Sequence, residues 1–562
     1  MARTGQFFPV IEGVPPLTWT CRQTRKIRRI AHQIGSFGDR LGSLRRQHAR
    51  IAGPESDNVE TASHSPYSPS PPLGAYRIHT SLGPTRVRVI HPAIPQWEAG
   101  MGERMTIGHF GDPRREERGA RILERAVACG SLTIRTIGET RAGEIAVHRF
   151  LDCPEVTVDE IITTVSERTA AACTKRRIVA VQDTTEINFR GRDRGRGLGK
   201  GGDGVGLGFF LHALIAVDVV DQAVLGVLGA EIWSREPEQD GSARQQRRKR
   251  ELEEKESQRW LTGAEMAAER AKGAAQAIIV GDRDSDIYGL FARRPQSVEL
   301  LVRAAQNRCV ADGSLLFAQA AAWPVLTRYE LAVPPRGPGD AGRTATIAVR
   351  AGSVAVKRPR NGFSADDPKQ IVLTLVEAAE EQPSSGTAAI HWRLLTTLPA
   401  STAAQATEVV NLYRLRWRIE QTFRALKRDG LGLPDVQLRD AERLFKLAAI
   451  GLAAAVRTIQ LVDARGGGPR PASDVAEPEL IAAAEAIGPT LEGKTERQKN
   501  PHPPRSLAWL AWIAARLGGW TGYYKPPGPK TMRRGWDRFA AMAEGYILAR
   551  QLQPKHVVTD HA

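Results

Sequence analysis

Four short segments rich in Val, Ile, Leu and Phe constrain the fold of this chain most strongly. They are IVAVQD (178–183), FFLHALIAVD (209–218), VLGVLGAEIW (224–233) and AIIVGD (277–282). Their length and composition predict buried strands, and a charged, helix-like segment separates the third from the fourth. Three strands, a helix and a strand predict an α/β core built around one sheet.

The rest of the chain divides into regions of different texture. Residues 1–105 are basic and then Ser/Pro-rich, which is typical of a partly disordered extension. Helical spacing predicts a small helical region over 106–172. The α/β core is expected over 173–437, with a β-rich insertion at about 310–388 and a long helix from about 402 to 428. Residues 438–562 are expected to be helical, with the amphipathic SLAWLAWIAARLGGW as the clearest segment.

The charge balance indicates a polyanionic partner. Lys and Arg total 79 against 62 Asp and Glu, which gives a net charge of +17, and nucleic acid is the first partner to consider. The five cysteines are scattered, with no C-x-x-C pair, so neither a disulfide framework nor a Cys-rich zinc site is predicted. No uninterrupted apolar stretch approaches 18 residues, and we expect a cytoplasmic protein without membrane association.

Asp183 and Asp282 each close one of the predicted strands. Strand ends of α/β sheets carry reactive side chains because packing no longer covers them. A carboxylate that caps the following turn is the alternative, and it fits Asp183 before Thr184 as well as Asp282 before Asp284.

The helix around residue 420 adds a stripe of four functional groups. At 100° per residue, Tyr413, Arg416, Glu420 and Lys427 fall within about 60° of one another. An apolar stripe beside them would anchor the helix on the core. The alternative is a solvated face on which Glu and Arg pair at four-residue spacing.

Two strand-end aspartates and one helical glutamate are the donor set that hard divalent cations require. Mg²⁺ takes oxygen ligands, and two ions about 4 Å apart can act on both oxygens of a phosphodiester displacement. Tyr, Arg and Lys beside them suit a phosphate group or a DNA end.

Three segments resemble the catalytic motifs of the DDE transposases of the insertion-sequence-four group. They are VQDTTEINF, VGDRDSDIYGLF and YRLRWRIEQTFRALK, and the last meets the group's Tyr-x2-Arg-x3-Glu-x6-Lys spacing. The resemblance continues in FGDPRREERGARIL, HWRLLTTLP and SLAWLAWIAARLGG, so it covers roughly residues 108–550. Residues 1–100 have no counterpart in the group.

The resemblance implies a ribonuclease-H-like catalytic core with an inserted β-rich subdomain, flanked by helical N- and C-terminal domains. Asp183, Asp282 and Glu420 would be the catalytic residues and the ligands of Mg²⁺, with Mn²⁺ as the other possible ion and no ATP. Such enzymes cut the transposon end, form a DNA hairpin, reopen it and join the end to target DNA. The implied partners are double-stranded DNA, as terminal repeats and target, and a second copy in a homodimer, in a bacterial cytoplasm at the nucleoid.

The resemblance also implies a set of DNA contacts. Trp392 corresponds to a tryptophan that stacks on a flipped base, and Tyr413, Arg416 and Lys427 to residues that grip nearby phosphates. Arg303 corresponds to a further phosphate contact. A core aromatic is the alternative for Trp392, and a surface arginine for Arg303.

Other basic and titratable residues are weighed separately. The Gly-rich loop FRGRDRGRGLGKGGDGVGLG lacks the first Gly and the Ser or Thr of a P-loop, so its cations are expected along a DNA backbone or in a solvated, mobile loop. The helical region 106–172 is expected to bind transposon ends, and its first helix could contribute DNA contacts. His148 and His212 are expected to be structural. The residues concerned are Arg190, Arg192, Arg194, Arg196 and Lys200 of the loop and Arg114, Arg115, Arg118 and Arg121 of the helix.

Two other classes of protein compete with a transposase. One is a DNA-binding protein that has lost catalysis, such as a decayed or domesticated copy, although Asp183, Asp282 and Glu420 are all present. The other is a ribonuclease-H-like nuclease without strand transfer. Trp392 and the complete signature from Tyr413 to Lys427 favour the transposase over that nuclease.

Overall fold

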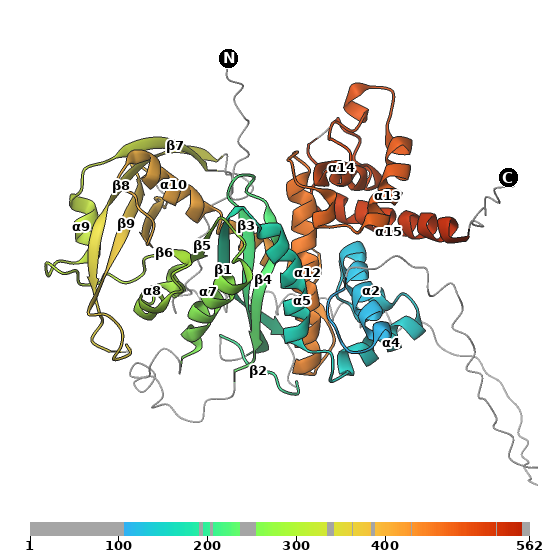
Figure 1. Cartoon of the computed structure of the whole chain (residues 1–562), viewed down its shortest axis with the longest axis horizontal. Helices are drawn as coiled ribbons and strands as arrows, with labels where there is room; N and C mark the ends of the chain where they lie inside the picture. Colours follow the sequence, from blue (N-terminus) through green and yellow to red (C-terminus); the bar gives the residue numbers. More distant parts are fainter. Residues whose placement is uncertain are drawn as a thin grey trace, which may run out of the picture. The chain divides into compact units, whose positions relative to one another are not determined.

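The computed structural model of the chain describes residues 106–189, 195–202, 206–235, 255–333, 342–361, 363–383, 388–428, 430–523 and 525–552. Within these residues the chain forms one large mixed sheet with helices on both faces (Figure 1). The N-terminal extension predicted over residues 1–105 lies outside the described residues.

The sheet has ten strands in the described residues, in the order β2-β3-β1-β5-β6-β10-β9-β8-β7, and β4 pairs with β3. Antiparallel pairing joins β1 to β3 and β3 to β4, whereas β1, β5 and β6 run parallel. The strand bounds are β1 (Arg177–Phe189), β2 (Gly199–Lys200), β3 (Leu207–Asp218), β4 (Val224–Trp233), β5 (Gln276–Gly281), β6 (Val298–Arg303), β7 (Thr327–Val333), β8 (Arg343–Lys357), β9 (Gln370–Glu380) and β10 (His391–Thr396).

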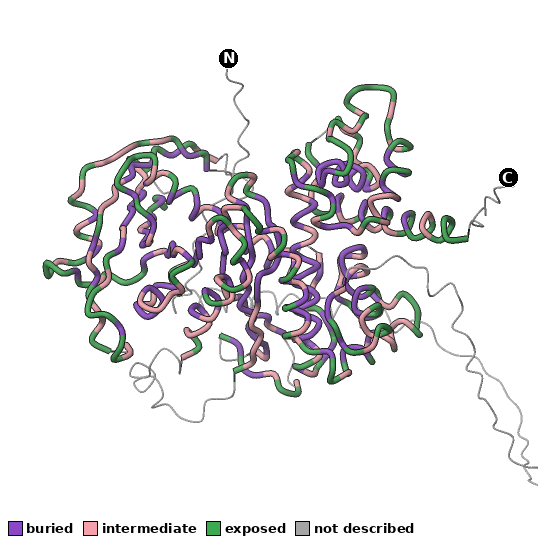
Figure 2. Tube along the Cα trace, viewed as in Figure 1, coloured by how far each residue is buried: buried purple, intermediate pink, exposed green. Residues whose placement is uncertain are grey.

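The two faces of the sheet are covered by different helices. On one face, β1 packs against α11 (Trp417–Lys427), and β4 packs against α5 (Val158–Cys173) and α12 (Ala441–Ala464). The other face packs against α7 (Arg259–Arg270) and α8 (Tyr288–Arg293). Side chains alternate along a strand, so Val179 and Val181 face the first layer and Ile178 and Ala180 the second. Figure 2 shows the central strands buried as a result.

The strands expected in the insertion continue the central sheet. β10 pairs with β6 on one side and β9 on the other, and β8 and β7 follow outward. α9 (Leu316–Ala322) packs on β8 and β9, as does α10 (Ala403–Arg414). These strands therefore lengthen the central sheet instead of forming a second one.

The long helix expected from about 402 to 428 is two helices. Between α10 and α11 the Leu415 N–H donates to the Leu412 carbonyl and the Arg416 N–H to the Tyr413 carbonyl, at 3.1 and 3.0 Å. These bonds span three residues and tighten the chain into a 3₁₀-like turn, which changes the direction of the side chains that follow. The expectation of a single continuous helix is wrong at this point.

Helices precede and follow the sheet in sequence. Several begin with a side-chain cap, as where the Asp112 carboxylate accepts from the Arg114 N–H and the Thr140 hydroxyl from the Gly143 N–H. Three short 3₁₀ turns lie before or within the central region, at Glu256–Gln258 (η2), Arg283–Ser285 (η3) and Leu433–Asp435 (η4). The remaining helices are α2 (Pro113–Cys129), α3 (Ile134–Gly138), α4 (Arg141–Asp152), α13 (Pro478–Ile487), α14 (Leu507–Leu517) and α15 (Pro529–Leu552), with 3₁₀ turns η5 (Ala472–Asp474), η6 (Gly488–Leu491) and η7 (Glu496–Gln498).

Two apolar helices are more deeply buried than their sequences suggest. α14, expected to be amphipathic, is buried at every residue from Leu507 to Ala515, so it has little solvent face. α12 is long and apolar enough to cross a membrane by length and composition alone, but 78% of its most apolar stretch is buried within the protein. It packs against α2, α5, β4, α14 and α15, which identifies it as a core helix of this fold.

Candidate active site

Strand register and alternation bring Asp183 and Asp282 together. Val181 of β1 lies opposite Val280 of β5, so the two aspartates, each two residues further on, lie at the same level. Both have the parity of the residues that face α11 and α12. Asp183 does not end its strand as expected, because β1 continues to Phe189 through pairing with β3. It lies where the parallel pairing with β5 has stopped.

Each aspartate also caps the backbone that follows it. Asp183 Oδ1 accepts from the Thr184 N–H at 2.7 Å, and Asp282 Oδ1 from the Asp284 N–H at 2.9 Å. The capping role and membership of the site are therefore compatible. Burial and the neighbouring Asp282 charge raise the pKa of Asp183 to about 7. Burial, followed by the charge of Asp284, raises the pKa of Asp282.

Arg416 connects the aspartates to the glutamate. Its guanidinium donates to Asp183 Oδ2 at 3.1 Å and also pairs with the Glu420 carboxylate four residues along the chain. Burial alone would lower the pKa of Arg416, but its interactions with Tyr413 and the two carboxylates raise it. The pairing of Arg and Glu at four-residue spacing, which was the alternative interpretation of this helix face, is therefore present. It is not on a solvated face, because Arg416 is only 16% exposed.

The described residues contain no group of three or more His, Cys, Asp or Glu side chains arranged to hold a metal ion. The expected three-carboxylate group is not formed in this structure, because the Arg416 guanidinium lies between Asp183 and Glu420. The pair Asp183 and Asp282 nevertheless fits a hard divalent cation. Two half-buried carboxylates, of which Asp282 makes Asp183 harder to ionise, are a donor set that such a cation would stabilise.

The residues expected to contact DNA gather beside the carboxylates. Tyr413 is 3% exposed, and its ring centroid lies 6.4 Å from that of Trp392, which is 7% exposed on β10. Arg303 at the end of β6 donates to the His391 carbonyl at 3.2 Å. Burial lowers the pKa of Arg303, while its contact with Tyr413 acts in the opposite direction. Trp392 thus packs as a core aromatic in this structure. It also lies next to Tyr413, among the residues expected to contact DNA.

Lys427, the last signature residue, is the C-terminal residue of α11. Burial lowers the pKa of its ammonium group, and the charges of Glu186 and Asp183 oppose that effect. All four signature residues therefore lie within electrostatic reach of Asp183 or of a residue in contact with it.

The Gly-rich loop approaches the same strand. Gly199 and Lys200 form β2 against β3, and a Cβ at Gly201 would lie 2.0 Å from Glu186 Oε1, so the Glu186 side chain packs closely against this turn. The Arg196 N–H donates to the Arg439 carbonyl at 2.9 Å. This part of the loop is therefore structured. Arg190, Arg192 and Arg194 lie outside the described residues.

A buried network behind Asp183 was not predicted from the sequence. The Thr184 hydroxyl contacts His212 Nδ1 and the Arg259 guanidinium, each at 2.9 Å, and His212 Nε2 contacts Gln182 Oε1 at 3.1 Å. Burial lowers the pKa of His212 to about 3, so the imidazole is neutral at pH 7. His212 is a structural histidine as expected. His148 likewise contacts Arg443.

A second unpredicted contact fixes the loop that carries Asp282. The Asp286 carboxylate accepts from the Ala305 and Gln306 N–H groups, each at 2.7 Å, and from Arg308 at 2.6 Å. The Asp286 side chain is fully buried, so this bidentate cluster joins the turn after β5 to the loop after β6. In the sequence, only the position of Asp286 four residues after Asp282 pointed to a role near the site.

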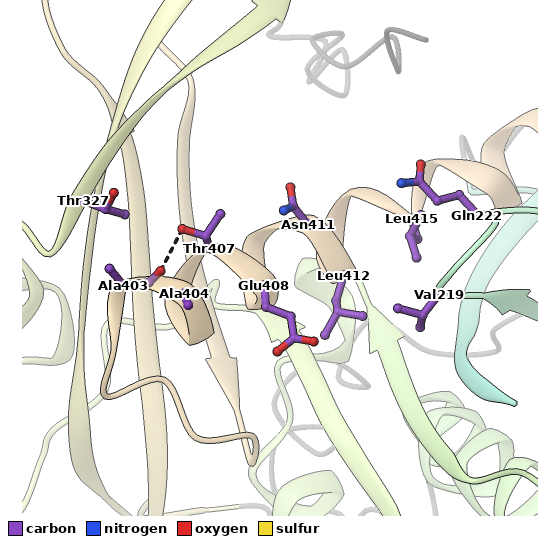
Figure 3. A pocket seen from close by; sticks show the side chains of 10 residues that line it. All are labelled: Val219, Gln222, Thr327, Ala403, Ala404, Thr407, Glu408, Asn411, Leu412 and Leu415. Carbon is purple, nitrogen blue, oxygen red and sulfur yellow. Dashed lines mark hydrogen bonds between the residues drawn. The ribbon is translucent and has the colours of Figure 1, made fainter. Parts of the chain in front are cut away.

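Two hollows on the described surface lie away from the carboxylates. One has a volume of about 420 Å³ and is lined mainly by α10 and the β3–β4 turn. Figure 3 shows its polar wall, where the Thr407 hydroxyl donates to the Ala403 carbonyl at 2.8 Å. The other, of about 830 Å³, lies beyond α11. The carboxylate site is thus distinct from both.

Residues 215–457 match the model of the transposase DDE domain family. The matched segment contains Asp282, Glu420 and the remaining signature residues, and Asp183 lies 32 residues before its start. The match supports a DDE transposase, a class of enzyme that cuts DNA. The mixed α/β architecture with one large central sheet is consistent with the ribonuclease-H-like domain of that class.

Proposed function

We propose that the protein is a cut-and-paste DNA transposase of the insertion-sequence-four group. One observation carries the proposal: residues from three distant segments converge on the α11 face of one sheet. Asp183 and Asp282 come from adjacent parallel strands, and Arg416 links Asp183 to Glu420. A structural salt-bridge network alone does not require two adjacent, half-buried aspartates.

The proposed cofactor is Mg²⁺, with Mn²⁺ as an alternative, held by Asp183, Asp282 and Glu420. When bound, it would supply Lewis-acid polarisation of the phosphodiester and generate the nucleophile. The chain's own contribution is to place the scissile phosphate. Arg416 and Lys427 would contact its oxygens, and the transfer of Arg416 from the carboxylates to phosphate would leave Glu420 free to complete the donor set.

The proposed reaction proceeds through a DNA hairpin. A hairpin at a transposon end needs a base expelled from the stack, and aromatic side chains hold such a base by stacking. Trp392 and Tyr413 are the aromatic pair beside the carboxylates, and Arg303 lies against Tyr413. We assign the flipped base to Trp392 and the adjacent phosphates to Tyr413, Arg303 and the signature cations.

The remaining parts of the proposal concern regions and partners. Residues 106–172 would bind the transposon end, 173–437 would carry catalysis with an insertion at about 310–388, and 438–562 would support dimerisation and DNA contact. The partners would be double-stranded DNA and a second copy of the chain on paired ends, in the bacterial cytoplasm at the nucleoid, without a membrane or ATP.

The direct test is Glu420→Gln in the full-length protein. The substrate is a DNA fragment that carries inverted repeats flanking the coding sequence, incubated with Mg²⁺ or Mn²⁺. We expect cleavage to fall by at least about 10³-fold, because a ligand charge is lost, while binding of the fragment in a mobility-shift assay is retained.

Glu408→Gln is the matched control. Glu408 lies on α10, is half-exposed and pairs with Arg177, so the variant removes the same charge outside the site. Its cleavage should equal that of the wild type. Wild-type cleavage by Glu420→Gln would refute the assignment, and end binding without cleavage by the wild type would favour a decayed DNA-binding protein.

A further inference from the structure

A wide cleft lies beside α11, and none of Asp183, Asp282 and Glu420 lines it. It has a volume of about 830 Å³ and is formed by α11, the ends of α12 and α15 and the β3–β4 turn. We call it the basic cleft, after the arginines that line it: Arg414, Arg418, Arg424, Arg465 and Arg533.

The basic cleft and the carboxylate site share α11 but not their lining residues. At 100° per residue, Arg418 and Ala425 lie about 140–160° around α11 from Glu420, whereas Arg424 lies about 40° from it. All three line the cleft, and Glu420 does not. The cleft therefore extends around α11 from the side opposite Glu420 to a position next to it.

The charge of the basic cleft is only partly neutralised by its own acidic residues. Its lining has five arginines but two aspartates, Asp221 and Asp463. Arg418 pairs with Asp463 at 2.8 Å and is held in place by that contact. Arg424 instead lies over the Trp417 ring, at 5.9 Å from its centroid. Arginines held on neutral partners keep their charge available to an anion.

The basic cleft also has apolar lining residues, among them Trp417, Trp520 and Pro527. Gln222 and Leu415 line both the basic cleft and the hollow of Figure 3, so the two hollows are adjacent. The arginines around these apolar residues suit the phosphate backbone of a DNA duplex, which lies on the outside of the double helix.

We infer that the basic cleft binds a second segment of DNA, through its phosphate backbone and without sequence preference. The inference rests on the proposed function, because a transposase must hold target DNA in addition to the end that it cuts. The lining has more arginines than aspartates, which favours a polyanion over a protein partner, and each guanidinium can pair with a phosphate.

The test is the salt dependence of binding to a duplex of about 30 base pairs unrelated to the flanking repeats. Arg414→Gln with Arg424→Gln removes two cations without touching the Arg418–Asp463 pair. Each phosphate contact contributes about 0.9 to the slope of log K against log salt, so the slope should become less steep by roughly 2. Gln421→Lys, which adds a cation to the cleft lining, should steepen it by about 1.

Arg360→Gln with Lys369→Gln is the matched control, with the same loss of charge at exposed positions outside the cleft. Equal slopes for the two double variants would overturn the inference. An unchanged slope together with a loss of dimers in mass photometry would also overturn it, in favour of a protein interface.

The outcome is separable from that of the proposed function. Glu420→Gln should keep the wild-type salt slope while losing cleavage, because Glu420 does not line the basic cleft. If the cleft variants left the salt slope unchanged, the cleavage result for Glu420→Gln would still stand. If the protein did not cleave DNA, the salt slope of duplex binding could still be measured.

Discussion

At the scale of single residues, the site is defined by the balance between like and unlike charges. The charge of Asp282 raises the pKa of Asp183, and the Arg416 guanidinium, which donates to Asp183, partly opposes that effect. In this structure Arg416 therefore stabilises the charged forms of Asp183 and Glu420. A bound cation, or a phosphate that drew Arg416 away, would change these contacts. The arrangement stores unfavourable electrostatic free energy at the place where a ligand would relieve it.

The raised pKa of Asp183 predicts a pH-dependent stability of the metal-free protein. A carboxyl group with a pKa of about 7 in the folded state and 3.8 as its ordinary value binds protons more tightly when folded. Its contribution to the free energy of unfolding therefore decreases as pH rises from about 4 to 7. We expect Asp183→Asn, in EDTA, to raise Tm at pH 8 by roughly 2–4 °C and by much less at pH 5.

The control for that measurement is Asp366→Asn, an exposed aspartate away from the site. Its Tm should follow the wild type at both pH values. If the Tm difference between Asp183→Asn and wild type were the same at pH 5 and pH 8, the folded-state pKa of Asp183 would have to be near its ordinary value.

Trp392 allows the stacking role to be separated from core packing. Truncation to Ala would create a cavity and cost about 3–5 kcal/mol, since the side chain is 7% exposed. Trp392→Leu retains more of the volume but loses the stacking surface, so we expect the first nick to proceed while hairpin formation falls at least about tenfold. Denaturing gels that resolve nicked and hairpin products measure both steps, with Tyr413→Phe as a control for loss of the hydroxyl. Equal loss of the two products would assign Trp392 to packing alone.

At the scale of elements, much of the site followed from the sequence. The strands that lead to Asp183 and Asp282 were predicted within a few residues, because their apolar runs are buried on both faces. The break between α10 and α11 could not be predicted, because its 3₁₀-like turn lies in a sequence with unbroken helical periodicity. The Thr184, His212 and Arg259 contacts depend on which strands become neighbours, and no local pattern encodes that.

The crossing of α14 and α15 predicts opposite effects for two glycines of one helix. A Cβ at Gly535 would lie 1.6 Å from the Ala514 carbonyl oxygen, so Gly535→Ala must push the helices apart. We expect a loss of about 1–3 kcal/mol in the free energy of unfolding. Gly545 has open space around it, and Gly545→Ala should stabilise α15 by about 0.5–1 kcal/mol. Urea unfolding followed by circular dichroism measures both, and destabilisation of similar size at the two positions would contradict the close crossing.

At the scale of the whole molecule, α12 connects parts that are far apart in sequence. It packs against α2 and α5 on the N-terminal side, against β4 of the sheet and against α14 and α15 on the C-terminal side. One buried cluster accordingly extends from Ile107 to Ala543. The regions drawn at residues 172 and 437 from sequence texture thus share a core, so we expect them to unfold together instead of as independent domains.

Leu447→Ala tests that cooperativity. Leu447 is fully buried at the centre of the shared cluster, and its truncation should cost about 2–5 kcal/mol. Because α12 contacts both the sheet and the C-terminal helices, amide exchange should accelerate by a similar factor in peptides from β1 and from α14. Glu442→Ala, at an exposed position of the same helix, should leave both unchanged. Acceleration confined to α14 would show that the C-terminal helices unfold on their own and that α12 does not couple them to the catalytic sheet.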